Sequence, residues 1–112
     1  MLNERENVYK TLLEMLPQRF FFKDKNLVHS ACNNRYASDF GKTPDEITGK
    51  TDYDLYPKDV AEKHIEVDRK ILKSGKTIEF EEEYVEDGQT FWINKIKATD
   101  VDTSHLCFGV VH

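Results

Sequence analysis

The chain has 112 residues, of which 33% are charged, and its formal net charge is −5. This length is enough for one domain with a buried core. The mildly acidic balance argues against a nucleic-acid partner, which would need clustered lysine and arginine. No apolar run is long enough to cross a membrane and no signal peptide leads the chain, so we expect a cytoplasmic protein with no membrane contact.

The two cysteines, Cys32 and Cys107, lie far apart in the sequence and form no Cys-x-x-Cys motif. This spacing excludes a sequence-evident zinc site, a dithiol redox motif and covalent haem attachment. One disulfide remains open in an oxidising compartment, although two free thiols are the simpler interpretation for a cytoplasmic protein.

The N-terminal segment predicts an amphipathic helix over residues 4–16, which Pro17 stops because proline cannot continue a helix. We therefore divide the chain into an N-terminal helical segment, residues 1–16, and a domain over residues 17–112. The apolar residues that recur at helical spacing are Val8, Leu12, Met15 and Leu16.

A β-hairpin and two short helices are predicted next. Residues 19–23 contain three consecutive phenylalanines of high β-propensity, and residues 27–32 form a second candidate strand after the turn Asp24-Lys25-Asn26. The short helices begin after Asn33 and Thr43, because the side chains of these residue types accept hydrogen bonds from free helix N–H groups.

The second half of the chain predicts one long helix and three strands. The helix begins near Pro57 and runs to about Lys73, and the strands cover residues 77–85, 89–98 and 106–111. Two strands, then helices, then three strands describe an α+β domain.

Both faces of the strand over residues 89–98 carry large apolar side chains, so we expect both to be covered. The main helix covers one face, and the N-terminal helix, from the same subunit or a partner, is the expected cover of the other. The more apolar face is expected to point toward the main helix, which leaves Lys95 solvated; the opposite orientation would let Lys95 meet Asp68 or a ligand carboxylate. The more apolar face carries Trp92, Ile96 and Ala98, and the other carries Phe91, Ile93, Lys95 and Lys97.

Two motifs and their order along the chain resemble a PAS domain of the bacterial and archaeal sensor type. The first is Asn33-Asn34-Arg35-Tyr36-Ala37. The second is Gly-Lys-Thr-Asp-Tyr-Asp-Leu-Tyr-Pro over residues 49–57, followed by a long helix that closes at Ser74-Gly75-Lys76. The resemblance runs from about Leu16 to His112. It implies a five-stranded antiparallel sheet, in the order 2-1-5-4-3, with the helices on one face.

The resemblance also implies sensing rather than catalysis. PAS domains of this type usually run on into Asp-Ile-Thr and a signalling helix. We therefore expect a fragment of a longer receptor, with an output domain such as a histidine kinase, a diguanylate cyclase or a chemoreceptor module beyond residue 112.

The least expected residues of the chain are His64 and Asp68, which lie four residues apart in the middle of the apolar stripe of the main helix. Buried polar groups are normally hydrogen-bonded, so one interpretation is a mutually satisfied core pair. The other interpretation is that the two side chains line a ligand cavity under the helix.

The PAS resemblance implies a small-molecule site between the sheet and the main helix. Tyr36 would pack in the core and could present its hydroxyl to a pocket, and Tyr56 belongs to a loop that often forms a pocket wall in PAS domains. The expected ligand-binding residues are His64, Asp68, Tyr36, Tyr56, Val60, Phe80, Tyr84, Ile93 and Lys95.

The cofactor, if any, is unknown from sequence. His64 lies at a position comparable to the proximal histidine of haem-binding PAS sensors, so haem bound through His64 is an alternative, although no arginine pair for the propionates is evident. The reactive-cysteine motif of flavin-binding sensors, Asn-Cys-Arg-Phe-Leu-Gln, is absent, and Cys32 ends a strand instead. The acidic run over residues 79–87 lacks the spacing of a calcium loop, so no metal site is expected.

No catalytic motif is visible, so we expect a sensory PAS domain, not an enzyme. It would bind a small molecule and regulate a C-terminal output domain. A ligand-free PAS domain that mediates homodimerisation or relays a signal is the first alternative, because the N-terminal helix and the two-sided sheet would supply a dimer contact. A haem-based gas or redox sensor is the second alternative.

Overall fold

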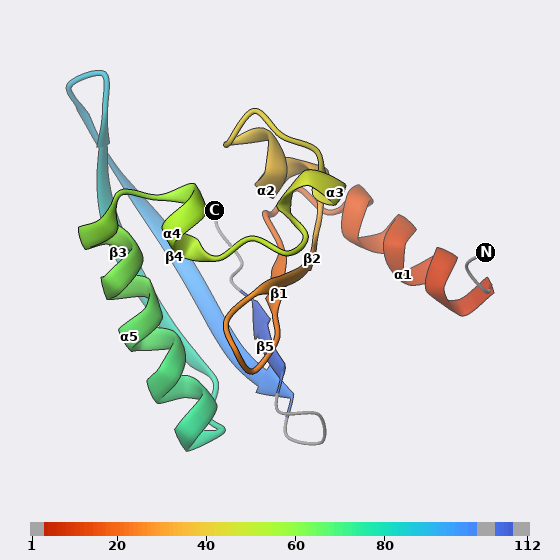
Figure 1. Cartoon of the computed structure of the whole chain (residues 1–112). Helices are drawn as coiled ribbons and strands as arrows, with labels where there is room; N and C mark the ends of the chain where they lie inside the picture. Colours follow the sequence, from red (N-terminus) through yellow and green to blue (C-terminus); the bar gives the residue numbers. More distant parts are fainter. Residues whose placement is uncertain (1–3, 101–104, 109–112) are drawn as a thin grey trace.

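A computed structural model of the protein describes residues 4–100 and 105–108. This part of the chain forms five helices and five strands (Figure 1). In chain order they are α1 (Glu4–Met15), β1 (Phe21–Lys23), β2 (His29–Cys32), α2 (Asn34–Ser38), α3 (Pro44–Ile47), α4 (Asp52–Leu55), α5 (Lys58–Ser74), β3 (Ile78–Glu86), β4 (Gln89–Asp100) and β5 (His105–Phe108).

The strands pair antiparallel, with hydrogen-bonded neighbours in the order β2-β1-β5-β4-β3. The pairing divides into two parts because β4 changes partner along its length. Residues 89–97 of β4 pair with β3, whereas Ala98, Thr99 and Asp100 pair with β5 after a register shift between Ala98 and Thr99. The expected α+β class is confirmed, but β4 divides the strands into two joined parts, β2-β1-β5-β4 and β4-β3, in place of one uniform five-stranded sheet.

The β3–β4 hairpin projects beyond the rest of the molecule (Figure 1). Asp87 and Gly88 form its two-residue turn, and both have positive φ, 51° and 76°. Two left-handed residues give a turn whose twist matches that of paired strands, and aspartate and glycine adopt this conformation at low cost. The register that follows, from Glu86 opposite Gln89 to Ile78 opposite Lys97, is unbroken.

The face of β4 that points toward α5 is opposite to the one expected from its apolar content. Lys97 is buried, with 3% of its surface exposed, whereas Trp92 on the other face is 63% exposed. The physical reason lies on α5, where the fully buried Asp68 accepts a hydrogen bond from Lys97. A buried carboxylate requires a cationic partner, and this requirement outweighs the hydrophobicity of Trp92.

The short helices are fixed by their capping residues. Thr43 and Glu46 form a reciprocal capping box at the start of α3, which confirms the predicted helix cap at Thr43. The helix α4 was not expected from sequence. It forms because the Asp54 carboxylate reaches back and accepts a hydrogen bond of 2.9 Å from the Thr51 N–H.

Helix α1 confirms the expected N-terminal helix but not its expected position. It extends away from the sheet (Figure 1), so within this subunit it does not cover the face that carries Trp92. Its apolar residues Val8, Leu12 and Met15 are between 51% and 74% exposed. None of the helices over the described residues is both long enough and apolar enough to cross a membrane.

Among the described residues, the apolar core contains two clusters of buried side chains. The apolar stripe of α5 faces this core, as predicted, with Ala61 and Ile71 fully buried. One cluster contains Phe21, Tyr36, Ala37 and Ile47, and the other contains Leu27 and Ile71. The expected last strand over residues 106–111 is described only as far as Phe108.

Asn33 joins the end of α1 to the start of α2. Its Oδ1 accepts hydrogen bonds from the backbone N–H groups of Tyr36 and Phe20, both at 3.1 Å. Its Nδ2 donates to the carbonyl oxygens of Leu13 and Gln18, at 3.1 and 2.8 Å. The predicted helix cap is therefore present, and the same buried side chain also fixes the approach of the preceding segment.

The substitution Asn33→Ala should lower the free energy of unfolding by about 2–4 kcal/mol. Loss of the cap accounts for about 1 kcal/mol, and loss of the other hydrogen bonds of the buried Asn33 side chain accounts for the rest. Urea denaturation would measure the change. Asn26→Ala, at an exposed turn position, is the matched control and should change stability by less than about 0.5 kcal/mol. Similar losses in both variants would contradict the role of Asn33.

Candidate functional site

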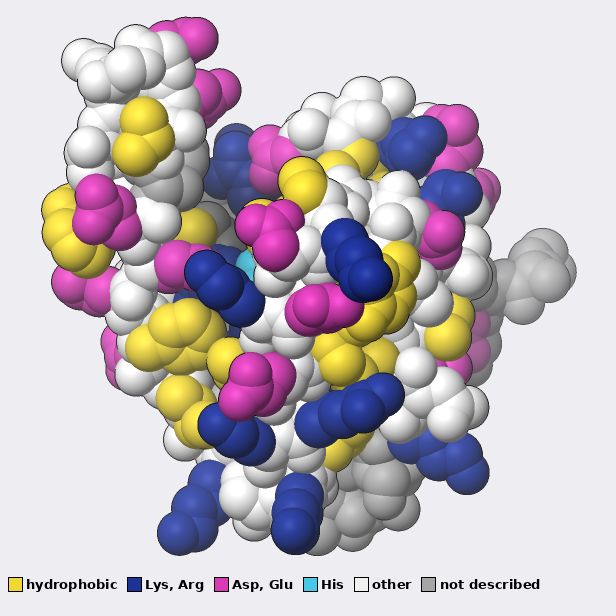
Figure 2. All heavy atoms as spheres, turned by 60° about the vertical axis from the view of Figure 1, so that its left-hand side comes forward, with side chains coloured by type: hydrophobic (Ala, Val, Ile, Leu, Met, Phe, Trp, Pro, Cys, Tyr) yellow, Lys and Arg dark blue, Asp and Glu magenta, His cyan; other side chains and the backbone are white. Residues whose placement is uncertain are grey.

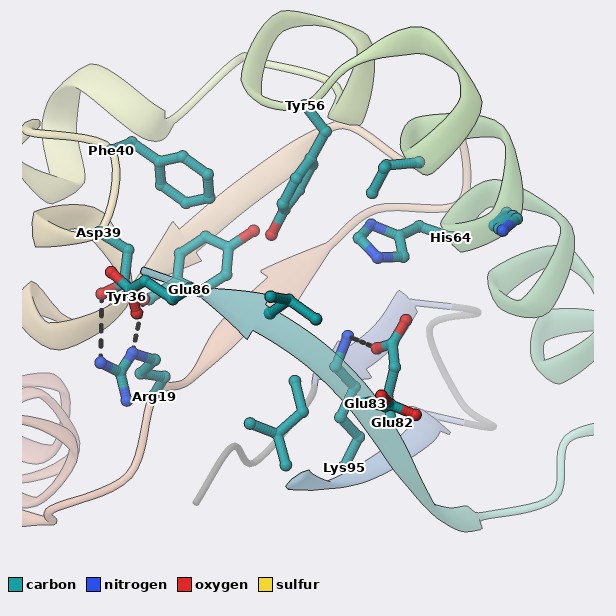
Figure 3. Close-up of a pocket in the computed structure, with 14 residues that line it drawn as sticks. Arg19, Tyr36, Asp39, Phe40, Tyr56, His64, Glu82, Glu83, Glu86 and Lys95 are labelled. Atoms are coloured by element: carbon teal, nitrogen blue, oxygen red, sulfur yellow. Dashed lines mark hydrogen bonds and ion pairs between the residues drawn. The ribbon is translucent and has the colours of Figure 1, made fainter. Parts of the chain in front are cut away.

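An open cleft of about 710 Å³ lies between the β3–β4 hairpin on one side and α2 and α5 on the other. Figure 2 shows the hollow between the projecting hairpin and the rest of the molecule, and Figure 3 shows its lining side chains. The apolar and aromatic lining consists of Tyr36, Phe40, Tyr56, Val60, Val85 and Ile93. The charged and polar lining consists of Arg19, Asp39, Lys63, His64, Glu82, Glu83, Glu86 and Lys95.

Most of the ligand-binding residues expected from sequence are brought together at this cleft. Asp68 and Phe80 do not line it, and the side chain of Tyr84 lies outside the described part of the structure. The expected residues that do line the cleft are Tyr36, Tyr56, Val60, His64, Ile93 and Lys95.

A row of rings forms one wall of the cleft. Phe40 lies between Tyr36 and Tyr56, with its ring centroid 5.3 Å from each, and His64 follows at 4.7 Å from Tyr56. The contacts from Phe40 to Tyr56 and from Tyr56 to His64 are both edge-to-face at 88°, the arrangement that aromatic quadrupoles favour. The wall is therefore a preformed aromatic surface that ends at an imidazole.

Two ion pairs line the cleft (Figure 3). The Arg19 guanidinium binds the Asp39 carboxylate, and the Lys95 ammonium binds Glu82 across the β3–β4 ladder. Partial burial of Glu82 would raise the pKa of its carboxyl, but the hydrogen bond and charge of Lys95 lower it. Only 12% of the Lys95 side chain is exposed, so the expectation of a solvated strand lysine is wrong.

A buried ion cluster lies beneath the cleft. Lys23 donates hydrogen bonds to Asp52 Oδ2 at 2.8 Å and to Asp68 Oδ2 at 2.7 Å, and Lys97 donates to Asp68 Oδ1 at 2.8 Å. All four residues are at most 3% exposed. Two ammonium groups and two carboxylates balance in charge, which is the condition under which such groups are tolerated inside a protein.

His64 and Asp68 do not form the mutually satisfied pair that their spacing suggested. Asp68 is occupied by Lys23 and Lys97 instead. The His64 Nδ1 lies 3.6 Å from Asp52 Oδ2, and its side chain is 13% exposed at the cleft. The two residues share the buried face of α5, but Asp68 belongs to the core and His64 to the cleft.

A directed chain of hydrogen bonds connects the cleft wall to His29. The His29 Nδ1 lies 2.7 Å from the Lys50 carbonyl oxygen, which only accepts, so Nδ1 carries the proton. In the neutral ring Nε2 then accepts from the Tyr36 hydroxyl at 2.9 Å. Burial lowers the pKa of His29, which keeps the ring neutral. Burial also raises the pKa of Tyr56 to about 12, so that hydroxyl remains a donor.

Sequence reasoning missed Lys23, His29, Asp52 and Lys97, although strand alternation carried a signal for two of them. Lys23 lies two residues after the buried Phe21, and Lys97 two residues after Lys95, so each shares a face with a lining or core residue. Asp52 lies within the Gly-Lys-Thr-Asp motif, but its partners come from distant segments.

Cys32 is partly buried against the core, and burial together with the nearby charge of Glu14 raises the pKa of its thiol to about 11. The thiol is therefore protonated at neutral pH and has low reactivity. Among the described residues, no three histidine, cysteine or carboxylate side chains are grouped so that they could hold a metal ion.

The family model of the PAS fold matches residues 13–101, which covers most of the chain. The chain belongs to the PAS family. A search of curated protein sequences gave no match.

Several solved structures share this PAS fold. VqmA of Vibrio cholerae, in a complex with ligand and DNA, is 22% identical with a TM-score of 0.74 over 99% of this chain and 52% of that chain. The PAS domain of Bordetella pertussis BvgS is 19% identical, with a TM-score of 0.69 over 96% of this chain and 81% of that chain. A sensory box histidine kinase of Vibrio cholerae is 17% identical, with a TM-score of 0.68 over 96% of this chain and 90% of that chain.

This PAS chain thus spans about half the length of VqmA. The expectation that nucleic acid is excluded as a partner is wrong. It was drawn from the charge of this domain alone, whereas a similar PAS domain occurs in a receptor that binds DNA.

The substitution Asp68→Asn should lower the free energy of unfolding by about 3–5 kcal/mol, because Lys23 and Lys97 would share one carboxylate in a buried site. Chemical denaturation at neutral pH would measure the loss. Glu62→Gln, which removes an exposed charge from the same helix, should cost less than about 0.5 kcal/mol. A small effect in both variants would show that the cluster is not held as described.

Stability should also depend on the neutral state of His29. Below pH of about 6.5 the unfolded chain protonates this histidine, but the folded state, in which its pKa is lowered, does not. The free energy of unfolding should therefore fall between pH 7.5 and 5, with His29 contributing at most about 1.4 kcal/mol per pH unit. In His29→Gln the slope should be shallower, as measured by urea denaturation at a series of pH values. Equal slopes in the two proteins would overturn this assignment.

Proposed function

We propose that this PAS domain is a sensory module that binds a small molecule in the cleft between α5 and the β3–β4 hairpin and regulates an output domain of a longer chain. The observation that carries the proposal is the cleft itself. Its volume of about 710 Å³ lies within the range of about 300–1,000 Å³ that is typical of small-molecule sites. Its walls combine aromatic surface with a few convergent polar groups, which is the usual composition of such sites.

Ligand binding in the cleft could change the structure of the rest of the domain through the two walls that the ligand contacts. Val60 and His64 reach the cleft from α5, whereas Ile93 and Lys95 reach it from the hairpin. A ligand that contacts both walls binds better at one separation of the walls than at another, and so favours that arrangement. Because β4 continues from the hairpin into its pairing with β5, a shift of the hairpin changes the strand at the C-terminal end of the described fold.

The similar structures support the proposal that this PAS domain belongs to a receptor, and they suggest two kinds of output domain. VqmA is described with both a ligand and DNA, and other similar PAS domains belong to sensor histidine kinases. A DNA-binding domain and a kinase are therefore the two outputs that we propose for a longer chain, with the PAS domain itself non-catalytic and cytoplasmic.

One observation favours a second candidate, a PAS domain that acts through homodimerisation. Val8, Leu12 and Met15 are exposed on α1, which extends away from the domain (Figure 1). In this alternative a second copy covers the helix and the cleft holds no ligand. The haem-sensor alternative has less support, because two of the three cations at the cleft, Arg19 and Lys95, are already paired and four carboxylates would repel the propionates.

The proposed function can be tested by a fragment screen with amide chemical shifts of the labelled protein as the readout. Some compounds should shift amides around the cleft, and Val60→Trp should abolish these shifts because the indole fills the space beside His64. Glu62→Trp places the same side chain on the exposed face of α5 and should leave binding unchanged. If no compound shifts the cleft, the ligand-sensing function fails and the dimerisation alternative is favoured.

A further inference from the structure

One oxygen of the buried Asp52 carboxylate has no hydrogen-bond partner among the described residues. Asp52 is 1% exposed, and its Oδ2 accepts from Lys23. Its Oδ1 is buried and accepts no hydrogen bond. An unsatisfied buried acceptor is unfavourable by roughly 1–3 kcal/mol, and more when it is charged, so native proteins contain few of them.

The hydrogen-bonding groups of His29 and Tyr36 are not available to this oxygen. The ring nitrogen Nε2 of His29 lies 3.8 Å from Asp52 Oδ1. It carries no hydrogen, because Nδ1 donates to the Lys50 carbonyl and Nε2 accepts from Tyr36. The Tyr36 hydroxyl hydrogen is committed to His29. The protein therefore leaves an anionic acceptor that its own groups are not oriented to serve.

Asp52 also lines a small cavity that shares four lining residues with the cleft. The cavity has a volume of about 20 Å³ and is lined by Asp52, Lys23 and Lys97 together with residues that also line the cleft. This volume suits one group the size of a water molecule. The residues common to the cavity and the cleft are Tyr36, Tyr56, His64 and Lys95.

We propose that the ligand of the cleft is an uncharged small molecule that places a terminal O–H or N–H group in this cavity and donates a hydrogen bond to Asp52 Oδ1. This inference rests on the proposed function of the cleft and specifies the chemical class of its ligand. The body of the ligand would lie against the ring wall formed by Tyr36, Phe40 and Tyr56.

The charge of the surroundings selects a neutral donor. Lys23 and Lys97 are balanced by Asp52 and Asp68, so a charged group in the cavity would add an uncompensated buried charge. An acceptor without a hydrogen would place its lone pairs against the Asp52 carboxylate. Anionic ligands also meet Asp39, Glu82, Glu83 and Glu86 around the cleft. A hydroxyl or a neutral N–H group meets none of these penalties.

Three probes that share one phenyl ring test the inference on the intact wild-type protein: phenol, anisole and benzoate. Phenol donates a hydrogen bond, anisole replaces the donor with a methyl ether, and benzoate is anionic. In titrations followed by amide chemical shifts, phenol should bind the cleft at least about tenfold more tightly than anisole, because a hydrogen bond to a charged group contributes about 1.5–3 kcal/mol. Benzoate should not shift the cleft amides.

A variant then assigns the preference to Asp52. Asp52→Asn keeps the shape and removes the anionic acceptor, so the preference for phenol over anisole should fall to within about twofold. Should this variant not fold, the wild-type comparison of the three probes still decides the inference.

The outcomes separate the inference from the proposed function. If phenol and anisole bind the cleft equally, the cleft remains a ligand site, but the inference is overturned and a resident water satisfies Asp52. If benzoate binds best, or if none of the three probes binds while other fragments of the screen do, the inference alone is overturned. If nothing in the screen binds, the proposed function fails with it.

Discussion

The buried ion cluster of Lys23, Asp52, Asp68 and Lys97 is the constraint on which the rest of the domain depends. Its members come from β1, α4, α5 and β4, and their hydrogen bonds measure 2.7–2.8 Å. A charged group left unpaired in the interior is strongly unfavourable, so these four elements must meet in one arrangement. Two of these elements, α5 and β4, also line the cleft, so the shape of the cleft depends on that arrangement.

This ion cluster determines how the four elements pack together, but it contributes little net free energy to folding. Desolvation of the ions offsets most of their mutual attraction, so the favourable energy of folding comes mainly from the adjoining apolar clusters around Phe21 and Ile71. Sliding α5 by one turn would preserve much of its apolar contact but would remove Asp68 from both lysines. The ions therefore select the register of α5 against β1 and β4 among packings of similar hydrophobic burial.

Local patterns predicted most of the elements, because periodicity and capping act within a few residues. The apolar stripe of α5 and the caps at Asn33 and Thr43 were visible in the sequence. Helix α4 is too short for periodicity to show. Which face of β4 points toward α5 depends on Asp68, and the contact made by His64 depends on Asp52. Each of these partners lies far away in sequence, so no local pattern could reveal them.

The fold and the cleft share one carboxylate. Asp52 balances Lys23 through one oxygen, and its other oxygen has no hydrogen-bond partner among the described residues. The same residue lines the small cavity that shares residues with the cleft, and in our proposal it sets the polarity of the site. A substitution there changes ligand chemistry only together with the core. The side chains of Val60 and Ile93 line the cleft without entering the cluster, and they can vary in size at little cost to the fold. For the ligand that we propose, shape is thus adjustable in this domain, whereas the proposed requirement for a hydrogen-bond donor is tied to the stability of the fold.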